Sequence, residues 1–203
     1  MKRAVVFVLT LVLIFLGYQF FEQETEIRNY PPKNAKIVAF GDSLVEGVGA
    51  STGKDFVSVL SVKIGEPIVN LGKSGNTTED GLKRLPEVIK MDAGTVLVLL
   101  GGNDYLRRIP KADTVKNLEK IIGELQSRGT LVVLLGVRGG LLKDNYEKEY
   151  RELAERAKAA YVPNVLEGIL GKASLMFDQI HPNDSGYEVI AQKVFSILKG
   201  LRE

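Results

Sequence analysis

The stretch from residue 96 to residue 104, Val-Leu-Val-Leu-Leu-Gly-Gly-Asn-Asp, joins five apolar residues to a glycine turn and two polar side chains. A short continuous apolar run that ends in turn residues is typical of a strand buried on both faces of a parallel sheet. Four other stretches have a similar β-rich, apolar character. The strand candidates in chain order are therefore residues 36–40, 68–71, 96–100, 131–137 and 159–162.

Segments with the apolar spacing of helices separate these runs. Their apolar positions are Phe56, Val57, Leu60 and Ile64; Val115, Leu118, Ile122 and Leu125; Tyr146, Tyr150, Leu153 and Ala157; and Tyr187, Ile190, Ala191, Val194 and Leu198. Strands that alternate with helices predict βαβ units, and hence a three-layer α/β/α sandwich around a five-stranded parallel sheet.

Local signals refine the expected helices. Thr52 with Asp55, and Thr77 with Asp80, have the spacing of helix-capping pairs. Pro86 lies inside the helical segment 78–90, and proline lacks the N–H that a helix interior needs. We therefore expect a break or a new helix start at Pro86.

The composition leaves room for one globular domain and excludes several classes of function. The 203-residue chain has 27 Lys and Arg against 25 Asp and Glu, so a net charge of +2 gives no broad basic surface for nucleic acid. Absence of cysteine excludes disulfides, thiolate metal sites and a cysteine nucleophile. His181 is the single histidine, so any chemistry that needs an imidazole has one candidate.

The N-terminal segment has the pattern of a membrane anchor. Lys2 and Arg3 precede an apolar run through Phe21, long enough to span about 27 Å as a helix. The next residues lack the small-x-small pattern of a cleavage site, which favours an anchor over a cleaved signal peptide that would release a secreted protein. The basic flank predicts that the domain lies outside the cytoplasm. We thus expect an anchor at 1–21, a solvated linker at 22–34 and the domain at 35–203.

Polar residues suited to catalysis follow the strand candidates. Gly-Asp-Ser-Leu at 41–44, Gly-Lys-Ser-Gly at 72–75 and Gly-Gly-Asn-Asp at 101–104 each begin where a strand ends. The carboxyl ends of parallel strands share one edge, where ligands bind in open α/β sheets. Asp178 and His181 precede the last helix, whose start faces that edge if it packs antiparallel to the strands. Serine, histidine, carboxylate and amide donors together are what nucleophilic catalysis requires.

Other interpretations of these motifs are weaker. Gly-Asp-Ser and Gly-Gly-Asn-Asp are also good turn sequences, but independent turns have no reason to supply all these groups at one edge. A phosphate loop fails because Gly47 and Gly53 are six residues apart, and Gly-x-Ser-x-Gly fails because Val45 stands at the second glycine position. No pair of carboxylates stands out for glycoside cleavage.

At these positions the sequence resembles the SGNH subgroup of GDSL hydrolases, and most of all its branch of bacterial thioesterases, lysophospholipases and arylesterases. The resemblance runs from about residue 36 to the C-terminus. It is carried by ordered blocks: FGDSL at 40–44, NLGKSG at 70–75, GLKRLP at 81–86, GGNDYLR at 101–107 and DQIHPN at 178–183.

The resemblance implies a flavodoxin-like order of strands and neither a metal nor an organic cofactor. It implies that Ser43 is the nucleophile, His181 the base and Asp178 its partner. The N–H groups of Ser43 and Gly72 and the side-chain amide of Asn103 would form the oxyanion hole. One departure is Tyr105, at a position where the family often has a small residue.

The expected reaction is hydrolysis of a small-molecule carboxylic ester or thioester, of acyl or lysophospholipid type, through an acyl-enzyme. Substrate-binding candidates at the edge are Leu44, Tyr105, Leu106 and Arg138. An O-acetylesterase acting on carbohydrate is the enzymatic alternative, and a membrane-tethered binding module is the non-enzymatic one. The sequence leaves the oligomeric state open.

Overall fold

The computed structural model describes residues 26–137 and 146–202. The expected membrane anchor at 1–21 and the substrate-binding candidate Arg138 lie outside these residues. Within the described ranges, no helix is both long and apolar enough to cross a bilayer.

A parallel sheet of five strands in the order β2-β1-β3-β4-β5 forms the centre of the domain. This confirms the predicted three-layer fold and its flavodoxin-like order. The three inner strands are buried along their length, whereas edge strand β2 is partly exposed. The strand bounds are Ile37–Gly41 for β1, Ile68–Gly72 for β2, Thr95–Leu99 for β3, Leu131–Leu135 for β4 and Ala160–Val162 for β5.

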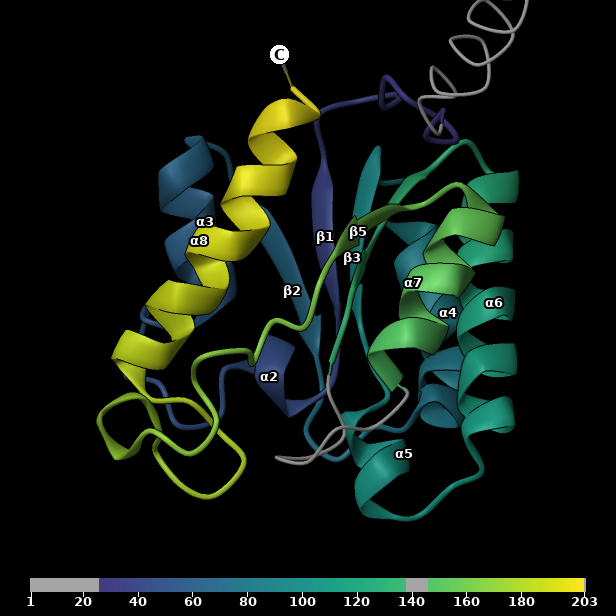
Figure 1. Ribbon diagram of the computed structural model, residues 1–203. Helices are drawn as coiled ribbons and strands as arrows, with labels where there is room; N and C mark the ends of the chain where they lie inside the picture. The colour runs from purple at the N-terminus through teal and green to yellow at the C-terminus, as the bar shows by residue number, and fades with distance from the viewer. Residues whose placement is uncertain (1–25, 138–145, 203) are drawn as a thin grey trace, which may run out of the picture.

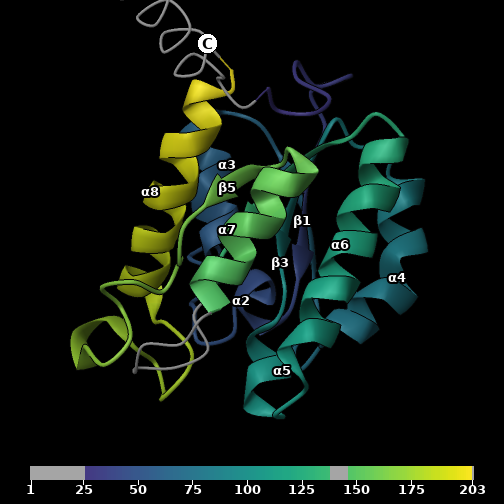
Figure 2. The ribbon, with the colours of Figure 1, turned by 45° about the vertical axis from the view of Figure 1, so that its right-hand side comes forward.

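Helices cover both faces of the sheet (Figure 1). On one face, α3 (Phe56–Ile64) packs against α8 (Asp184–Gly200). On the other face, α6 (Lys111–Ser127) packs between α4 (Thr78–Lys90) and α7 (Tyr146–Ala157), as the turned view shows (Figure 2). The predicted apolar stripes face inward, and the largest fully buried side chains include Phe40, Phe56, Tyr150 and Tyr187.

Three short elements complete the described chain. Helix α2 (Ser43–Glu46) follows β1 directly, and α5 (Gly102–Leu106) follows β3. A 3-10 turn, Ala173–Leu175, precedes α8. Both short helices lie at the carboxyl edge of the sheet, where the sequence predicted the functional residues (Figure 1).

Two local predictions were wrong. Helix α4 continues through Pro86, although the proline removes one internal hydrogen bond. Buried Leu85 and Val88 hold the helix against the sheet, and a capping box at Thr77 fixes its start. The cap of α3 is Asp55, whose carboxylate accepts the N–H of Ser58 at 3.0 Å, and not Thr52.

Residues 26–36 bind along the amino edge of the sheet, and we call this segment the strap. The N–H of Arg28 donates to the carbonyl of Lys158 at 2.8 Å. Asn29 donates to the carbonyls of Gln126 and Thr130 at 2.8 and 3.0 Å, and Lys33 pairs with Asp92 at 2.5 Å. Residues 26–34 of the expected linker are exposed or half-exposed, and several of their polar groups bind the domain.

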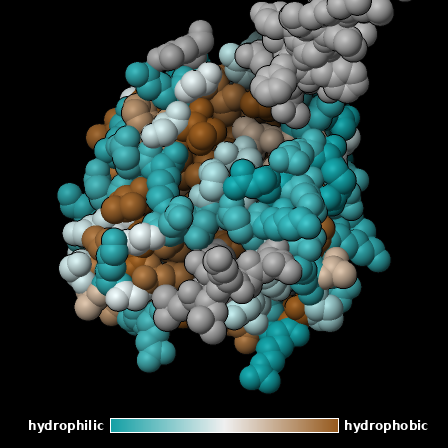
Figure 3. All heavy atoms as spheres, in the orientation of Figure 1, coloured by the Kyte–Doolittle hydropathy of each residue, from teal (hydrophilic) through white to brown (hydrophobic). Residues whose placement is uncertain are grey.

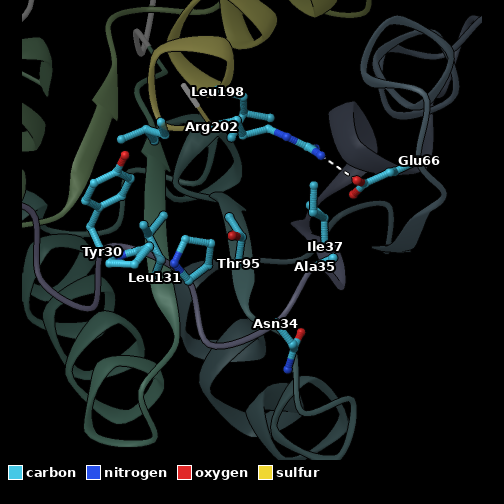
Figure 4. Close-up of a pocket in the computed structure, with 12 residues that line it drawn as sticks. Tyr30, Asn34, Ala35, Ile37, Glu66, Thr95, Leu131, Leu198 and Arg202 are labelled. Carbon is cyan, nitrogen blue, oxygen red and sulfur yellow. Dashed lines mark hydrogen bonds and ion pairs between the residues drawn. The ribbon is translucent and has the colours of Figure 1, made fainter.

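A cavity of about 410 Å³ lies beneath the strap (Figure 4). Tyr30 and two prolines of the strap line it, together with the first residues of three strands and an ion pair between Arg202 and Glu66. The outer faces of the helices are largely hydrophilic, and hydrophobic residues show in the hollow between α8 and α7 (Figure 3). Because the cavity is at the amino edge, it lies at the opposite end of the strands from Ser43.

Candidate active site

Ser43, His181 and Asp178 form a hydrogen-bonded row at the carboxyl edge of the sheet. The Oγ atom of Ser43 lies 3.1 Å from Nε2 of His181. The other ring nitrogen of His181, Nδ1, lies 2.8 Å from Oδ2 of Asp178. This order places a nucleophile against a base and the base against an orienting carboxylate, which is the geometry of a serine hydrolase.

Strand β1 and the cap of α2 hold Ser43. The strand ends at Gly41, Asp42 accepts the N–H of Leu44 at 3.0 Å as the helix cap, and Ser43 is the first helical residue. Ser43 is 8% exposed, so it is almost fully buried. The N–H of Ser43 has no acceptor among the described residues, because it belongs to the first turn of the helix.

A tight loop before α8 presents the carboxylate and the imidazole together. Oδ1 of Asp178 accepts the N–H groups of Ile180 and His181 at 2.8 and 2.7 Å, and the N–H of Phe177 donates to the carbonyl of His181 at 2.9 Å. Burial raises the pKa of Asp178, but the hydrogen bonds from His181 and Ile180 outweigh it and hold that pKa below its usual value. Asp178 is therefore ionised at neutral pH and can orient the Nδ1–H of His181.

Asp42, the neighbour of Ser43, has the opposite electrostatic environment. Complete burial raises its pKa to about 7, although the hydrogen bond from Leu44 and the charge of His181 oppose this change. Asp104, also buried, adds a like charge that raises the pKa of Asp42 further. The site thus contains an ionised carboxylate at Asp178, in the row, and a second carboxyl group at Asp42, beside Ser43, that gains a proton near neutrality.

Helix α5 brings Asn103 to the same edge. Its side-chain Nδ2 donates to the carbonyl of Asn76 at 2.9 Å, which ties it to the loop after β2. The next residue, Asp104, accepts the N–H of Thr78 at 2.9 Å and the hydroxyl of Thr114 at 3.2 Å. Buried Asp104 therefore fixes α5 against α4 and α6 and leaves the Asn103 amide at the edge.

The structure corrects the predicted role of Gly72. Its N–H donates to Oδ1 of Asn70 at 2.8 Å, so this donor is already used. A Cβ at Gly72 would lie 2.0 Å from the backbone nitrogen of Glu46, so the glycine allows β2 to approach α2. Gly75 was missed: its φ is +76° and its N–H has no acceptor among the described residues. It also directly precedes Asn76, whose carbonyl binds Asn103.

The predicted substrate-binding residues differ in their exposure. Tyr105 and Leu106 are 37% and 52% exposed beside Asn103, whereas Leu44 is 5% exposed and belongs to the core. Phe177 and Ile180 were missed, although they are 65% and 42% exposed and flank Asp178 in the sequence. The sequence could have indicated them, because they are apolar residues in the same loop as the catalytic candidates Asp178 and His181.

No cluster of three potential metal ligands occurs within residues 26–137 and 146–202. A parallel α/β/α fold with a serine–histidine–aspartate row at the carboxyl edge defines the class of the protein, a serine hydrolase.

Known proteins identify the family within this class. Residues 39–189 match the profile of the GDSL-like Lipase/Acylhydrolase family. Esterase TesA of Pseudomonas aeruginosa is 30% identical over 177 residues, which cover 81% of this chain and 88% of the relative. Thioesterase 1/protease 1/lysophospholipase L1 of Escherichia coli is 31% identical over 167 residues, which cover 76% of this chain and 79% of the relative.

A solved structure gives the same result. The crystal structure of TesA matches with a TM-score of 0.76 and 30% identity, over 82% of this chain and 99% of that chain. The chain belongs to the GDSL-like lipase/acylhydrolase family and is a serine ester hydrolase.

The raised pKa of Asp42 predicts a pH-dependent stability. Folded Asp42 keeps its proton up to about pH 7, whereas the unfolded chain loses it near pH 3.8. The stability that the protonated group contributes is complete below the unfolded pKa and is lost as pH rises through the folded one. Asp42→Asn keeps an acceptor for Leu44 and cannot ionise, so it should gain stability relative to wild type between pH 4 and pH 8, by up to about 4 kcal/mol.

Urea denaturation at several pH values measures this difference. Asp80→Asn is the control, because the hydrogen bonds from Thr77 lower the pKa of Asp80, and above the unfolded pKa its difference in stability from wild type should stay constant. A constant difference between Asp42→Asn and wild type from pH 4 to pH 8 would contradict the raised pKa.

Proposed function

We propose that the protein hydrolyses carboxylic esters and thioesters of apolar acyl chains through an acyl-enzyme on Ser43. The observation that carries this proposal is the continuous row from Oγ of Ser43 through His181 to Asp178. The hydroxyl is a weak nucleophile until a base takes its proton, and His181 is the one imidazole in the chain.

The geometry supports a two-stage reaction. With Nδ1–H donated to ionised Asp178, Nε2 of His181 accepts the proton of Ser43 as Oγ attacks the carbonyl carbon. Collapse of the tetrahedral intermediate breaks the bond to the leaving group, which takes the proton from His181. Water then attacks the acyl-enzyme, again giving its proton to His181, and releases the carboxylic acid and free Ser43.

Three donors are placed to stabilise the oxyanion. The N–H groups of Ser43 and Gly75 have no acceptor among the described residues, and Nδ2 of Asn103 lies beside the Gly75–Asn76 turn. A single strong donor of this kind is typically worth about 3–4 kcal/mol in the transition state. We assign Gly75 to this role in place of Gly72, whose N–H is bound to Asn70.

The surroundings of Ser43 favour an apolar acyl group. Tyr105 and Leu106 are exposed on the Asn103 side, and Phe177 and Ile180 on the His181 side. Exposed apolar side chains grouped at a site commonly bind apolar ligand. An acetyl group on a carbohydrate would use little of this surface, which disfavours the O-acetylesterase alternative. The names of the relatives, an esterase and a thioesterase/lysophospholipase, fit the same substrate class.

We also propose that residues 1–21 anchor the enzyme in a membrane, with the domain on the extracytoplasmic side. The support is the apolar run behind Lys2 and Arg3. The strap enters the domain at the amino edge of the sheet, opposite the Ser43 edge (Figure 1). Five residues, 22–26, separate the apolar run from Ile27 and reach at most roughly 18 Å, whereas a domain of this size is about 40 Å across. The site would therefore face away from the anchoring bilayer.

The roles of Ser43 and His181 can be tested with a serine-directed probe. Wild type should be labelled by a fluorophosphonate, whereas Ser43→Ala and His181→Ala should lose both labelling and ester hydrolysis without loss of thermal stability. Ser61→Ala is a matched control, because Ser61 is a helical serine bound to the carbonyl of Glu66. Labelling that persists in Ser43→Ala would show that another residue is the nucleophile.

Acyl preference tests the substrate class. Across p-nitrophenyl esters from acetate to dodecanoate, kcat/KM should rise with the length of the acyl chain. Phe177→Ala should make this rise smaller and leave the turnover of acetate unchanged, because an apolar side chain contributes only to the binding of an apolar chain. Val62→Ala, at an exposed apolar position on α3, is the control. An optimum at acetate would favour the O-acetylesterase, and no turnover of any ester would favour the binding module.

Linker length tests the orientation. In vesicles, the full chain should resist carbonate extraction and hydrolyse soluble esters faster than lysolipid in its own bilayer. A flexible insertion of about 20 residues after residue 25 should raise only the lysolipid rate, because it allows the domain to turn over. The same insertion after Glu203 is the control. Equal lysolipid rates with and without the insertion after residue 25 would contradict the orientation, and release of a shortened protein would show a cleaved signal.

A further inference from the structure

The loop between β2 and α4, residues 73–77, joins the proposed oxyanion donors. It contains Gly75, whose N–H is one donor, and Asn76, whose carbonyl binds the amide of Asn103, another donor. Any displacement of this loop would therefore move two donors relative to Ser43. The loop is held by the groups that it binds, which include the Gly41 carbonyl and the side chains of Glu46 and Arg107.

Arg84 of α4 holds both ends of this loop. Its Nη1 donates to Oδ1 of Asn76 at 2.8 Å, and its Nη2 donates to the carbonyl of Leu71 at 3.0 Å. The Leu71 carbonyl belongs to the last peptide group of β2 before the loop begins. The guanidinium is a rigid planar fork, so two such bonds fix the distance between the two loop ends more firmly than two independent donors would.

The same guanidinium is also attached to the strand of the nucleophile. Its carbon lies 5.4 Å from the ring centroid of Phe40, a fully buried residue of β1 three positions before Ser43. The Arg84 side chain is 15% exposed, so solvent weakens these contacts little. One side chain thus relates β1, the end of β2 and Asn76 to one another.

We propose that Arg84 is a positioning residue for the oxyanion hole. It acts through Asn76 and Leu71, and has no contact with the substrate. This inference rests on the proposed function, in which Ser43 forms the acyl-enzyme and Gly75 and Asn103 bind the oxyanion. Donors that are held in advance stabilise developing charge without reorganising during the reaction, so a loosened loop slows the chemical step and leaves ground-state binding intact.

Three variants separate this role from simple stabilisation of α4. Arg84→Met keeps the apolar stem over Phe40 and removes every donor. Arg84→Lys keeps the charge, but an ammonium lacks the planar fork. Glu87→Gln is the matched control, because Glu87 contacts Arg84 at 3.3 Å on the exposed side of α4 and, among the described residues, binds no atom of the loop.

For Arg84→Met we expect kcat to fall about 10- to 100-fold with KM within about threefold of wild type. Arg84→Lys should recover only part of this loss, and Glu87→Gln should match wild type. A phenylboronic acid, which forms a tetrahedral adduct on Ser43 with an oxygen in the oxyanion hole, should bind Arg84→Met more weakly by a similar factor. A fatty alcohol, which forms no adduct, should bind both proteins equally.

A double variant tests the route through Asn76. If Arg84 acts through that side chain, Arg84→Met with Asn76→Ala should lose little more activity than the more damaging single variant. Unchanged kcat in Arg84→Met, or an equal loss in Glu87→Gln, would overturn the proposal. Activity that survives in Ser43→Ala would instead overturn the proposed function, so the two failures are distinguishable.

Discussion

The in-register pairing of β1 between β2 and β3 is the constraint on which the site depends. Gly41, the last residue of β1, lies opposite Gly72 of β2 and Leu99 of β3. Three strands therefore end at the same level, and the segments that follow them carry Ser43, Gly75 and Asn103. A shift of one strand by a single residue would move its loop by about 3.3 Å and turn its side chains to the other face. The buried apolar faces of β1 and β3 make such a shift costly.

The sequence predicted the sheet and the row of Ser43, His181 and Asp178 because these rest on local patterns and scarce residue types. Buried strands give long apolar runs, and a single histidine leaves no choice of base. The sequence could not show which of Gly72 and Gly75 has a free N–H for the oxyanion. The N–H of Gly72 is occupied by the side chain of Asn70, another residue of β2, and only the structure shows this bond. The binding of the strap was equally hidden, since Asn29 reaches carbonyls about one hundred residues away.

Two aspartates at this edge are held in different protonation states by their surroundings. Asp178 lies near solvent and accepts three hydrogen bonds, so its carboxylate stays ionised beside His181. Asp42 lies in the buried end of β1, accepts the N–H of Leu44, and gains a proton near neutrality. Full ionisation of both would place two negative charges near the imidazole and the developing oxyanion. The difference between them keeps the charge that orients His181 and reduces the charge that would repel the oxyanion.

The segments at the two edges of the sheet are held by different kinds of contact. At the amino edge the strap binds mostly backbone carbonyls next to β3, β4 and β5, and the ion pair of Lys33 with Asp92 adds a side-chain contact. At the carboxyl edge the loops carry the reacting groups, and these loops are held by side chains: Arg84 and Arg107 on the loop after β2, and Asp104 on α5. A single substitution in the domain can therefore move a loop that a side chain holds. The position of the strap depends mainly on the strap's own residues, because most of its partners in the domain are backbone carbonyls. The binding of the strap and the geometry of the loops at the carboxyl edge are therefore set by separate parts of the sequence.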